Sequence, residues 1–170
     1  FSMAFYNKGY CQLKLEKFGP AIEEFKKFSQ SDYARSNPEM YTDACMRMAD
    51  CYFIIRDYSK AIESYNIIIN GKLNGTDYAL YLKAMILGVQ SKSSEKITSL
   101  ELIKSNYPKS AYIDDALFEI ANVNLQTENY EAAISGFQNI IENYPRCIYI
   151  RKAMLNKGLA YYNTNRDDKA

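Results

Sequence analysis

The sequence repeats itself with a period of 35 to 40 residues. Alanine recurs at spacings of 40, 35, 37 and 37 residues, at Ala4, Ala44, Ala79, Ala116 and Ala153. A second small residue follows each alanine five positions later, at Gly9, Ala49, Ala84, Ala121 and Gly158. Internal repeats of this length are single supersecondary units that bury their apolar faces only by stacking on neighbours. The chain is therefore expected to be an array of stacked repeats.

Three further columns keep the same spacing. Seventeen residues after each first alanine come Ala21, Ala61, Lys96, Ala133 and Ala170. Bulky residues follow four positions later, at Phe25, Tyr65, Leu100 and Phe137, and three beyond those, at Phe28, Ile68, Ile103 and Ile140. Helix axes approach to about 8–10 Å only where the side chains at the crossing are short. The columns thus predict helices that cross at small residues and fill the remaining space with large ones.

Each repeat contains two apolar stripes at helical spacing with a polar turn between them. A proline ends the second stripe in the third and fourth repeats, after Tyr107 and Tyr144, because proline lacks the amide donor that a helix needs. The expected helix pairs are 2–15 with 18–29, 39–55 with 58–70, 77–91 with 94–106, and 109–126 with 130–143, followed by a final helix at 146–163. Residues 29–38 and 70–77 are the loosest connectors. Ser93 and Lys96 break the pattern of the third repeat, whose turn should be less tightly packed.

Composition narrows the class of function. The 170 residues include no His, and 21 basic residues balance 20 acidic ones. Without His, the usual general base and the commonest zinc ligand are missing. Balanced charge lacks the basic footprint of nucleic-acid binding, and no apolar stretch approaches the roughly 20 residues that span a bilayer. We expect a protein that is not an enzyme, with no cofactor, no metal site, no nucleic-acid partner and no direct membrane insertion.

The four cysteines, Cys11, Cys45, Cys51 and Cys147, show no spacing typical of metal binding. Cys45 and Cys51 lie on different faces of one expected helix, too far apart for a disulfide between them. We interpret all four as small buried thiols in helix packing. A disulfide or redox role is the alternative.

The columns resemble the tetratricopeptide repeat, most clearly at residues 21–25, 61–65 and 133–137. The resemblance implies an all-α fold, a right-handed α-solenoid of antiparallel helix pairs. It covers the whole chain as repeats at about 1–37, 38–75, 76–108 and 109–145, with a partial fifth at 146–170. The tryptophan expected in each repeat is absent. The unfinished fifth repeat favours a segment of a longer protein.

Repeats of about 37 residues with Tyr-Pro endings look like the longer variants in bacterial envelope proteins. Those include the outer-membrane assembly lipoprotein and the Tol–Pal coordinator. The similarity implies the periplasm or cell envelope. A cytoplasmic location is the alternative, because four thiols without evident partners persist more readily in a reducing compartment.

The family resemblance also implies a function, the binding of a protein or peptide in a concave groove lined by the first helix of each repeat. The residues that this resemblance places in the groove are Tyr6, Tyr10, Met46, Asp50, Tyr81, Met85, Phe118, Asn122, Leu155 and Leu159. The alternative is packing between repeats, because bulky side chains at this spacing more often belong to a core than to a binding site. Asp50 and Asn122 are expected to be the more accessible members, because an unpaired buried polar group costs stability. No lysine stands on this stripe, so a clamp for a partner's terminal carboxylate is not expected.

Two other functions stay open. The chain could be a structural spacer in a longer solenoid, with end-to-end contacts to further repeats and no partner of its own. It could also be a helical domain that binds a glycan or small ligand.

Overall fold

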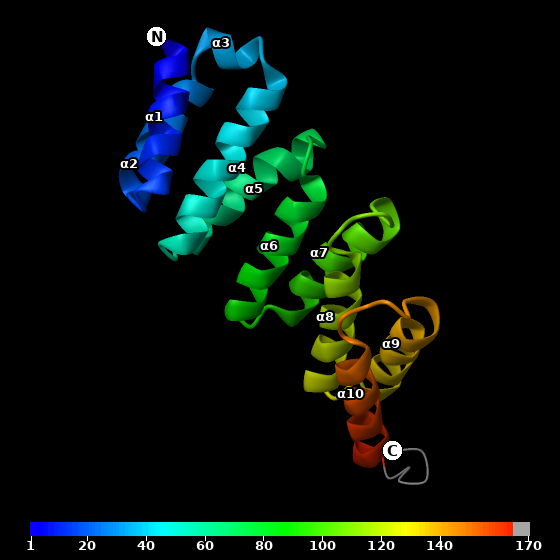
Figure 1. Cartoon of the computed structure of the whole chain (residues 1–170). Helices are drawn as coiled ribbons and strands as arrows, with labels where there is room; N and C mark the ends of the chain where they lie inside the picture. The colour runs from blue at the N-terminus through cyan, green and yellow to red at the C-terminus, as the bar shows by residue number, and fades with distance from the viewer. Residues whose placement is uncertain (165–170) are drawn as a thin grey trace. The chain divides into compact units, whose positions relative to one another are not determined.

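The computed structural model describes residues 1–164, which form ten α-helices and no strand (Figure 1). The helices are α1 (Ser2–Lys14), α2 (Phe18–Ser29), α3 (Asp32–Arg35), α4 (Pro38–Ile54), α5 (Tyr58–Gly71), α6 (Thr76–Val89), α7 (Ser93–Asn106), α8 (Ile113–Gln126), α9 (Tyr130–Asn143) and α10 (Ile150–Asn163). The expected all-α fold class is confirmed. Ala170, the last of the recurring second-helix residues named above, lies outside the described residues.

The helices form two compact units, unit 1 from Phe1 to Ile86 and unit 2 from Leu87 onward, with the boundary inside α6. In unit 1, α1 packs on α2, α2 on α4, and α4 on α5. In unit 2, α8 packs on both α7 and α9, and α9 packs on α10. Each unit therefore contains helix pairs in which a first helix lies against its own second helix and against a neighbouring repeat.

The predicted columns form the cores of both units. All eight bulky residues that recur in the second helices, from Phe25 to Ile140, are fully buried. The recurring second-helix alanines Ala21, Ala61 and Ala133 are fully buried too. The first-helix alanines Ala44, Ala79, Ala116 and Ala153 are fully buried as well. Ala4, on the first helix, is exposed. The residues that recur in the sequence are therefore, except for Ala4, the residues at which the helices pack.

The same backbone turn joins the two helices of four successive repeats. A residue with left-handed φ, between 56° and 62°, lies twelve positions after the first alanine in each case, at Glu16, Arg56, Ser91 and Glu128. The next backbone N–H then donates to the carbonyl five residues earlier, as from Lys17 to Gln12 O at 2.9 Å and from Asn129 to Asn124 O at 2.8 Å. This pairing satisfies carbonyl groups that a helix end leaves open. The third repeat shares the turn, so its expected loosening is absent from the backbone.

Lys96, which replaces a small alanine, extends past Gly88 to an ion pair with Glu119 on α8. Its side chain is only 12% exposed. The alkyl part of the Lys96 side chain thus packs against Gly88, at a position where three other repeats have a buried alanine. The ammonium group of Lys96 stays paired with a carboxylate.

One helix was not expected, and the starts of two others were placed too early. Residues 32–35 of the supposed loose connector form α3, whose first turn is capped by Ser31 Oγ, 3.2 Å from the backbone nitrogen of Ala34. α8 and α10 each begin four residues later than expected, because turns follow the prolines. In the turn before α8, Ser110 N–H donates to Tyr107 O. In the turn before α10, Cys147 N–H donates to Tyr144 O.

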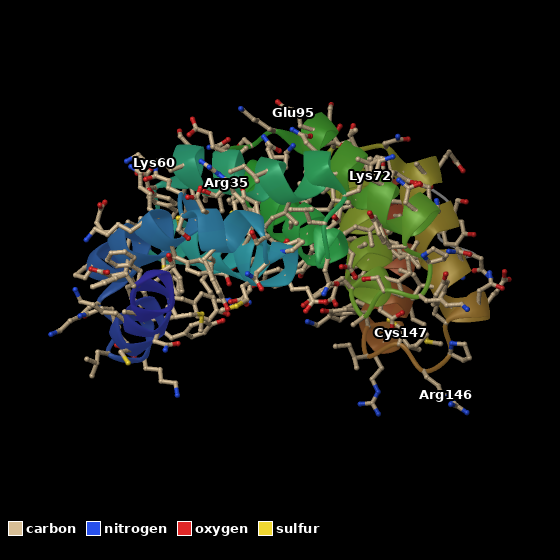
Figure 2. The ribbon with its side chains drawn as sticks, turned by 90° about the horizontal axis from the view of Figure 1, so that it is seen from above. Arg35, Lys60, Lys72, Glu95, Arg146 and Cys147 are labelled. Carbon is tan, nitrogen blue, oxygen red and sulfur yellow. The ribbon has the colours of Figure 1, made fainter. Side chains whose placement is uncertain are left out.

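The cysteines are all free thiols. Cys45, Cys51 and Cys147 are buried as expected, whereas Cys11 on α1 is exposed, so the expectation of four buried thiols was wrong for Cys11. Cys147 lies beside Arg146 in the turn before α10 (Figure 2). Within residues 1–164, no helix is both long and apolar enough to cross a membrane, and no cluster of three potential metal ligands occurs.

Candidate protein-binding surface

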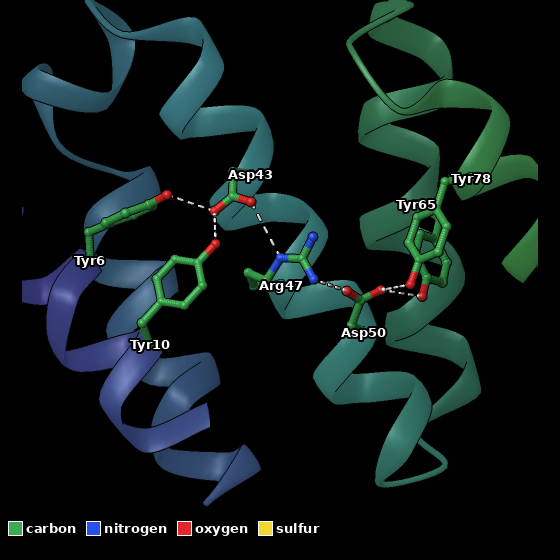
Figure 3. A network of polar contacts seen from close by, with 7 residues as sticks. All are labelled: Tyr6, Tyr10, Asp43, Arg47, Asp50, Tyr65 and Tyr78. Carbon is green, nitrogen blue, oxygen red and sulfur yellow. Dashed lines mark hydrogen bonds and ion pairs between the residues drawn. The ribbon is translucent and has the colours of Figure 1, made fainter. Parts of the chain in front are cut away.

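Three of the predicted groove residues of unit 1, Tyr6, Tyr10 and Asp50, belong to a polar network centred on α4 (Figure 3). Tyr6 and Tyr10 of α1 both donate their hydroxyl hydrogens to the Asp43 carboxylate, Tyr6 at 2.7 Å. Their rings meet edge to face at 5.1 Å, and Tyr10 meets the buried Phe25 ring at 5.3 Å. Burial and the Asp43 hydrogen bond raise the pKa of both tyrosines. Their polar ends are therefore bound within the protein.

Arg47 continues the network to the next carboxylate. Its Nε lies 3.4 Å from Asp43 Oδ1, and its Nη1 lies 2.8 Å from Asp50 Oδ2. The other Asp50 oxygen accepts from Tyr65 of α5 at 3.0 Å and from Tyr78 of α6 at 3.1 Å. Two carboxylates and one guanidinium thus connect α1, α5 and α6 to α4.

The expectation that Asp50 is accessible was wrong. Only 13% of its side chain is exposed. Burial raises its pKa above the ordinary value, while Arg47 and the two tyrosine hydroxyls act against that rise. The sequence argument assumed that Asp50 would lack partners, but three neighbouring side chains supply them.

Met46, Tyr81 and Met85 are the remaining predicted residues of unit 1. Met46 is 6% exposed, and its terminal methyl group lies 2.8 Å from where a Cβ would stand on Gly75. Gly75 has φ of +79°, so it provides both the turn and the space for the methionine. Tyr81 and Met85 are half-buried on α6. Met46 is therefore core, while Tyr81 and Met85 keep part of their surface accessible.

In unit 2, Phe118 and Asn122 of α8 contact α10 and the turn before it. Phe118 is 6% exposed and stacks on Tyr149, with ring centroids 4.4 Å apart and planes 7° from parallel. Tyr149 donates its hydroxyl hydrogen to Asp115 at 2.5 Å. Asn122 is half-buried and accepts from the Asn156 amide at 2.8 Å, so the expectation of an open Asn122 was also wrong.

α10 presents the most exposed members of the stripe. Leu155 is 73% exposed and Leu159 47% exposed, although Phe118 holds the position equivalent to Leu155 on α8. Tyr162, one turn further on, is 64% exposed, and Met154 is 53% exposed. These four side chains, which we call the α10 apolar face, share one side of the helix with Arg151 and Gly158.

The predicted stripe missed six residues that contact its members within the two separate units or belong to the same hydrogen-bond networks: Asp43, Arg47, Tyr65 and Tyr78 in unit 1, and Asp115 and Tyr149 in unit 2. Asp43, Arg47 and Asp50 are spaced four and three residues apart, which places them on one helix face where opposite charges pair. That spacing is a readable signal in the sequence. The tyrosine donors lie on other helices or, for Tyr149, in the turn before α10, and they had no such local signal.

Comparison with known proteins finds a tetratricopeptide repeat in one part of the chain and the same fold in solved structures. Residues 115–146 match the family model of the tetratricopeptide repeat. Over 97% of its length the chain is 27% identical to the outer membrane protein assembly factor BamD of Rickettsia prowazekii, covering 74% of that protein.

Solved structures agree on the fold. A tetratricopeptide repeat protein from Parabacteroides merdae superposes with a TM-score of 0.78 at 15% identity, over 98% of this chain and 62% of that one. MamA gives 0.72 at 21% identity, over 98% and 84% of the two chains. YrrB, described as a tetratricopeptide protein with an unusual peptide-binding site, gives 0.71 at 14% identity, over 99% and 80%. The predicted resemblance to tetratricopeptide proteins is confirmed.

Proposed function

We propose that this chain, whose repeats resemble the tetratricopeptide repeat, is a non-enzymatic scaffold that binds a protein or peptide partner through its first helices. The observation that carries this proposal is the α10 apolar face, on which the predicted residues Leu155 and Leu159 are exposed together with Tyr162. Contiguous exposed apolar side chains on a soluble domain mark interaction surfaces. Leucine, methionine and tyrosine suit protein contacts because they offer large areas with little charge.

The structure supports dividing the ten predicted residues by role. Tyr6, Tyr10, Asp50 and Asn122 are occupied by hydrogen bonds between helices, and Met46 and Phe118 are core. We assign partner contact to Leu155 and Leu159 in unit 2 and to the half-buried Tyr81 and Met85 in unit 1. Leu155 is the residue expected to contribute most, because it is the most exposed of these side chains.

The similarity to BamD supports a cellular setting. BamD is named as an outer membrane protein assembly factor, so we propose that this chain acts in the bacterial envelope and that its partners belong to outer membrane protein assembly. Fractionation of cells that make the complete natural gene product tests the location. Recovery with the cytoplasmic fraction would instead support the cytoplasmic alternative.

Site-specific photo-crosslinking tests partner binding. A photoreactive amino acid in place of Leu155 should give an adduct with another protein in cells, and mass spectrometry should identify that protein as an envelope assembly component. The same group at Leu102, an exposed leucine of α7 in the same unit, is the matched control. Leu155→Ser should abolish capture of the identified partner, whereas Leu102→Ser should leave it unchanged.

Folding of both variants is checked by circular dichroism, because each substitution removes an already exposed leucine and should leave helix content intact. Absence of any adduct at Leu155, Leu159, Tyr81 and Met85 would contradict the proposal. That result would favour the structural spacer.

A further inference from the structure

The sequence contains two Asn–Gly dipeptides close together, Asn70-Gly71 and Asn74-Gly75. In such a dipeptide the glycine nitrogen can attack the side-chain carbonyl carbon of the asparagine and close a five-membered ring. Glycine favours this attack because it has no side chain to hinder the approach. The two dipeptides have the same chemistry, but the structure places them in different backbone conformations.

Asn74 lies in the turn between α5 and α6, and it is exposed. No other residue of 1–164 forms a hydrogen bond with its side-chain amide or with the Gly75 N–H. Both reacting groups are therefore accessible to water and free to take the geometry of ring closure.

Asn70 is exposed as well, but it lies in the last turn of α5 (Tyr58–Gly71). A helix fixes ψ and engages the N–H of each residue with the carbonyl four residues before it. The Gly71 nitrogen is therefore held within the helical pattern, and ring closure at Asn70 first requires local opening of the helix end.

The fold requires the glycine that makes Asn74 reactive. Gly75 has φ of +79°, a conformation that residues with a Cβ rarely adopt. A Cβ at this position would also stand 2.8 Å from the terminal methyl group of Met46. A larger residue at position 75 would slow the reaction, but it does not fit the turn.

We propose that Asn74 is a site of non-enzymatic deamidation, at which water is the only co-reactant. The Gly75 nitrogen bonds to Asn74 Cγ, and the side-chain nitrogen leaves as ammonia with the hydrogen of the Gly75 N–H. Water then opens either carbonyl of the ring, which yields aspartate or isoaspartate. An amide becomes a carboxylate, so the formal net charge falls by one from +1 to 0.

Isoaspartate at this position disturbs the start of α6. It passes the main chain through the former side chain and adds one carbon atom to the backbone before Gly75. The next residue, Thr76, is 5% exposed, and its hydroxyl lies 2.6 Å from Leu73 O and 3.3 Å from Ile68 O. A longer backbone between Leu73 and Thr76 displaces these hydrogen bonds and leaves a buried hydroxyl without its partners.

Peptide mapping by mass spectrometry, during incubation at mildly alkaline pH, tests the site. Trypsin cleaves after Lys72, so Asn70 and Asn74 fall in separate peptides, which end at Lys72 and Lys83. The peptide ending at Lys83 should gain the mass of the amide-to-carboxylate exchange and become a substrate for isoaspartate methyltransferase. Asn70 should react about tenfold more slowly, because a helix opening of about 1.4 kcal/mol lowers the rate by that factor.

The unfolded chain is the control for the effect of structure. In urea α5 is lost, and the two asparagines should react at similar rates. Asn74→Gln should remove the reaction at this position, because glutamine would have to close a less favourable six-membered ring. Asn70→Gln should leave the rate at Asn74 unchanged. Equal rates at Asn70 and Asn74 in the folded protein, or a difference that persists in urea, overturn the inference.

A second measurement tests the effect on the turn. Ion exchange isolates the deamidated chains by their changed charge, and Asn74→Asp provides the same charge on an unaltered backbone. In urea denaturation, the deamidated fraction should contain a component that unfolds at a lower urea concentration than Asn74→Asp. If all of the deamidated fraction unfolds together with Asn74→Asp, the predicted disturbance of Thr76 is wrong.

Discussion

Asp50 on α4 accepts a hydrogen bond from Tyr78 on α6, with 3.1 Å between the carboxylate and hydroxyl oxygens. The same carboxylate oxygen accepts from Tyr65 at 3.0 Å, and the other pairs with Arg47. The carboxylate of Asp50 therefore joins the second repeat to the first helix of the third.

Removing this acid should destabilise unit 1. We expect Asp50→Ala to lower the free energy of unfolding by about 2–4 kcal/mol, because it leaves Arg47 and the hydroxyls of Tyr65 and Tyr78 without their shared partner. Asp50→Asn, which keeps an acceptor, should cost less. Urea denaturation followed by circular dichroism measures both. Asp32→Ala removes a fully exposed ion pair with Arg35 and should have no measurable effect; a loss as large as that of Asp50→Ala would contradict the role of the network.

Much of the fold was readable in the sequence. The columns located every long helix, and the bounds expected for the second helices at 18–29 and 130–143 match α2 and α9. α3 was missed because four residues carry too little periodicity to be recognised. The shared left-handed turn was missed for a different reason. Glu16, Arg56, Ser91 and Glu128 occupy it, and none is the glycine that signals this backbone conformation.

The candidate surface was less predictable. The family resemblance placed Tyr6, Asp50 and Phe118 on the predicted stripe, but a position within a repeat does not reveal which neighbour covers each side chain. Asp50 is buried by donors on α5 and α6, and Phe118 by the Tyr149 ring. Equivalent positions on α10 stay exposed. Identical columns therefore have different accessibility, which depends on tertiary contacts.

The left-handed turns predict a stabilising substitution. Replacing Glu128 or Arg56 by glycine removes the steric cost of a Cβ at positive φ, and the free energy of unfolding should rise by up to about 1 kcal/mol. Glu63→Gly, at an exposed position inside α5, should instead lower it by about 1 kcal/mol. Thermal unfolding of the three variants gives the comparison, and a loss of stability in both turn variants would count against the strained-turn interpretation.

Glu24 should make unit 1 sensitive to acid. The hydrogen bond from Lys8, at 2.8 Å, together with Lys27, holds the pKa of its carboxyl below the ordinary value of 4.5, against the opposing effect of burial. As pH falls, the unfolded chain binds a proton at this carboxyl before the folded chain does. The contribution of Glu24 to stability is therefore complete when the pH is above the ordinary pKa of the carboxyl. It is lost as the pH falls through the lower pKa that the carboxyl has in the folded chain.

Urea denaturation at about pH 6 and about pH 3 measures this linkage. Glu24→Gln should reduce the difference in unfolding free energy between the two conditions. Glu23→Gln, its exposed neighbour, should reproduce the wild-type difference. Identical pH dependence in wild type and Glu24→Gln would exclude the proposed linkage.

Thiol labelling should distinguish the four cysteines. A thiol-specific reagent at mildly alkaline pH should modify one thiol in the folded protein, the exposed Cys11, and four after denaturation. Burial raises the pKa of Cys51 to about 11, which suppresses the reactive thiolate there as well as access to it. Cys11→Ser should abolish the rapid phase; persistent rapid labelling in that variant would show that a buried thiol is reached.

The carboxylates of α4 also restrict how this array can change length in evolution. Asp43 serves the tyrosines of the repeat before it, and Asp50 serves a tyrosine of the repeat after it. Deleting the second repeat would leave those tyrosine hydroxyl groups without their carboxylate acceptors. Duplicating it would add carboxylates without the tyrosine donors that pair with them. The repeats of this chain share one turn and one packing pattern. The hydrogen bonds of Asp43 and Asp50 nevertheless require the first three repeats to follow one another in this order, so these repeats cannot be exchanged.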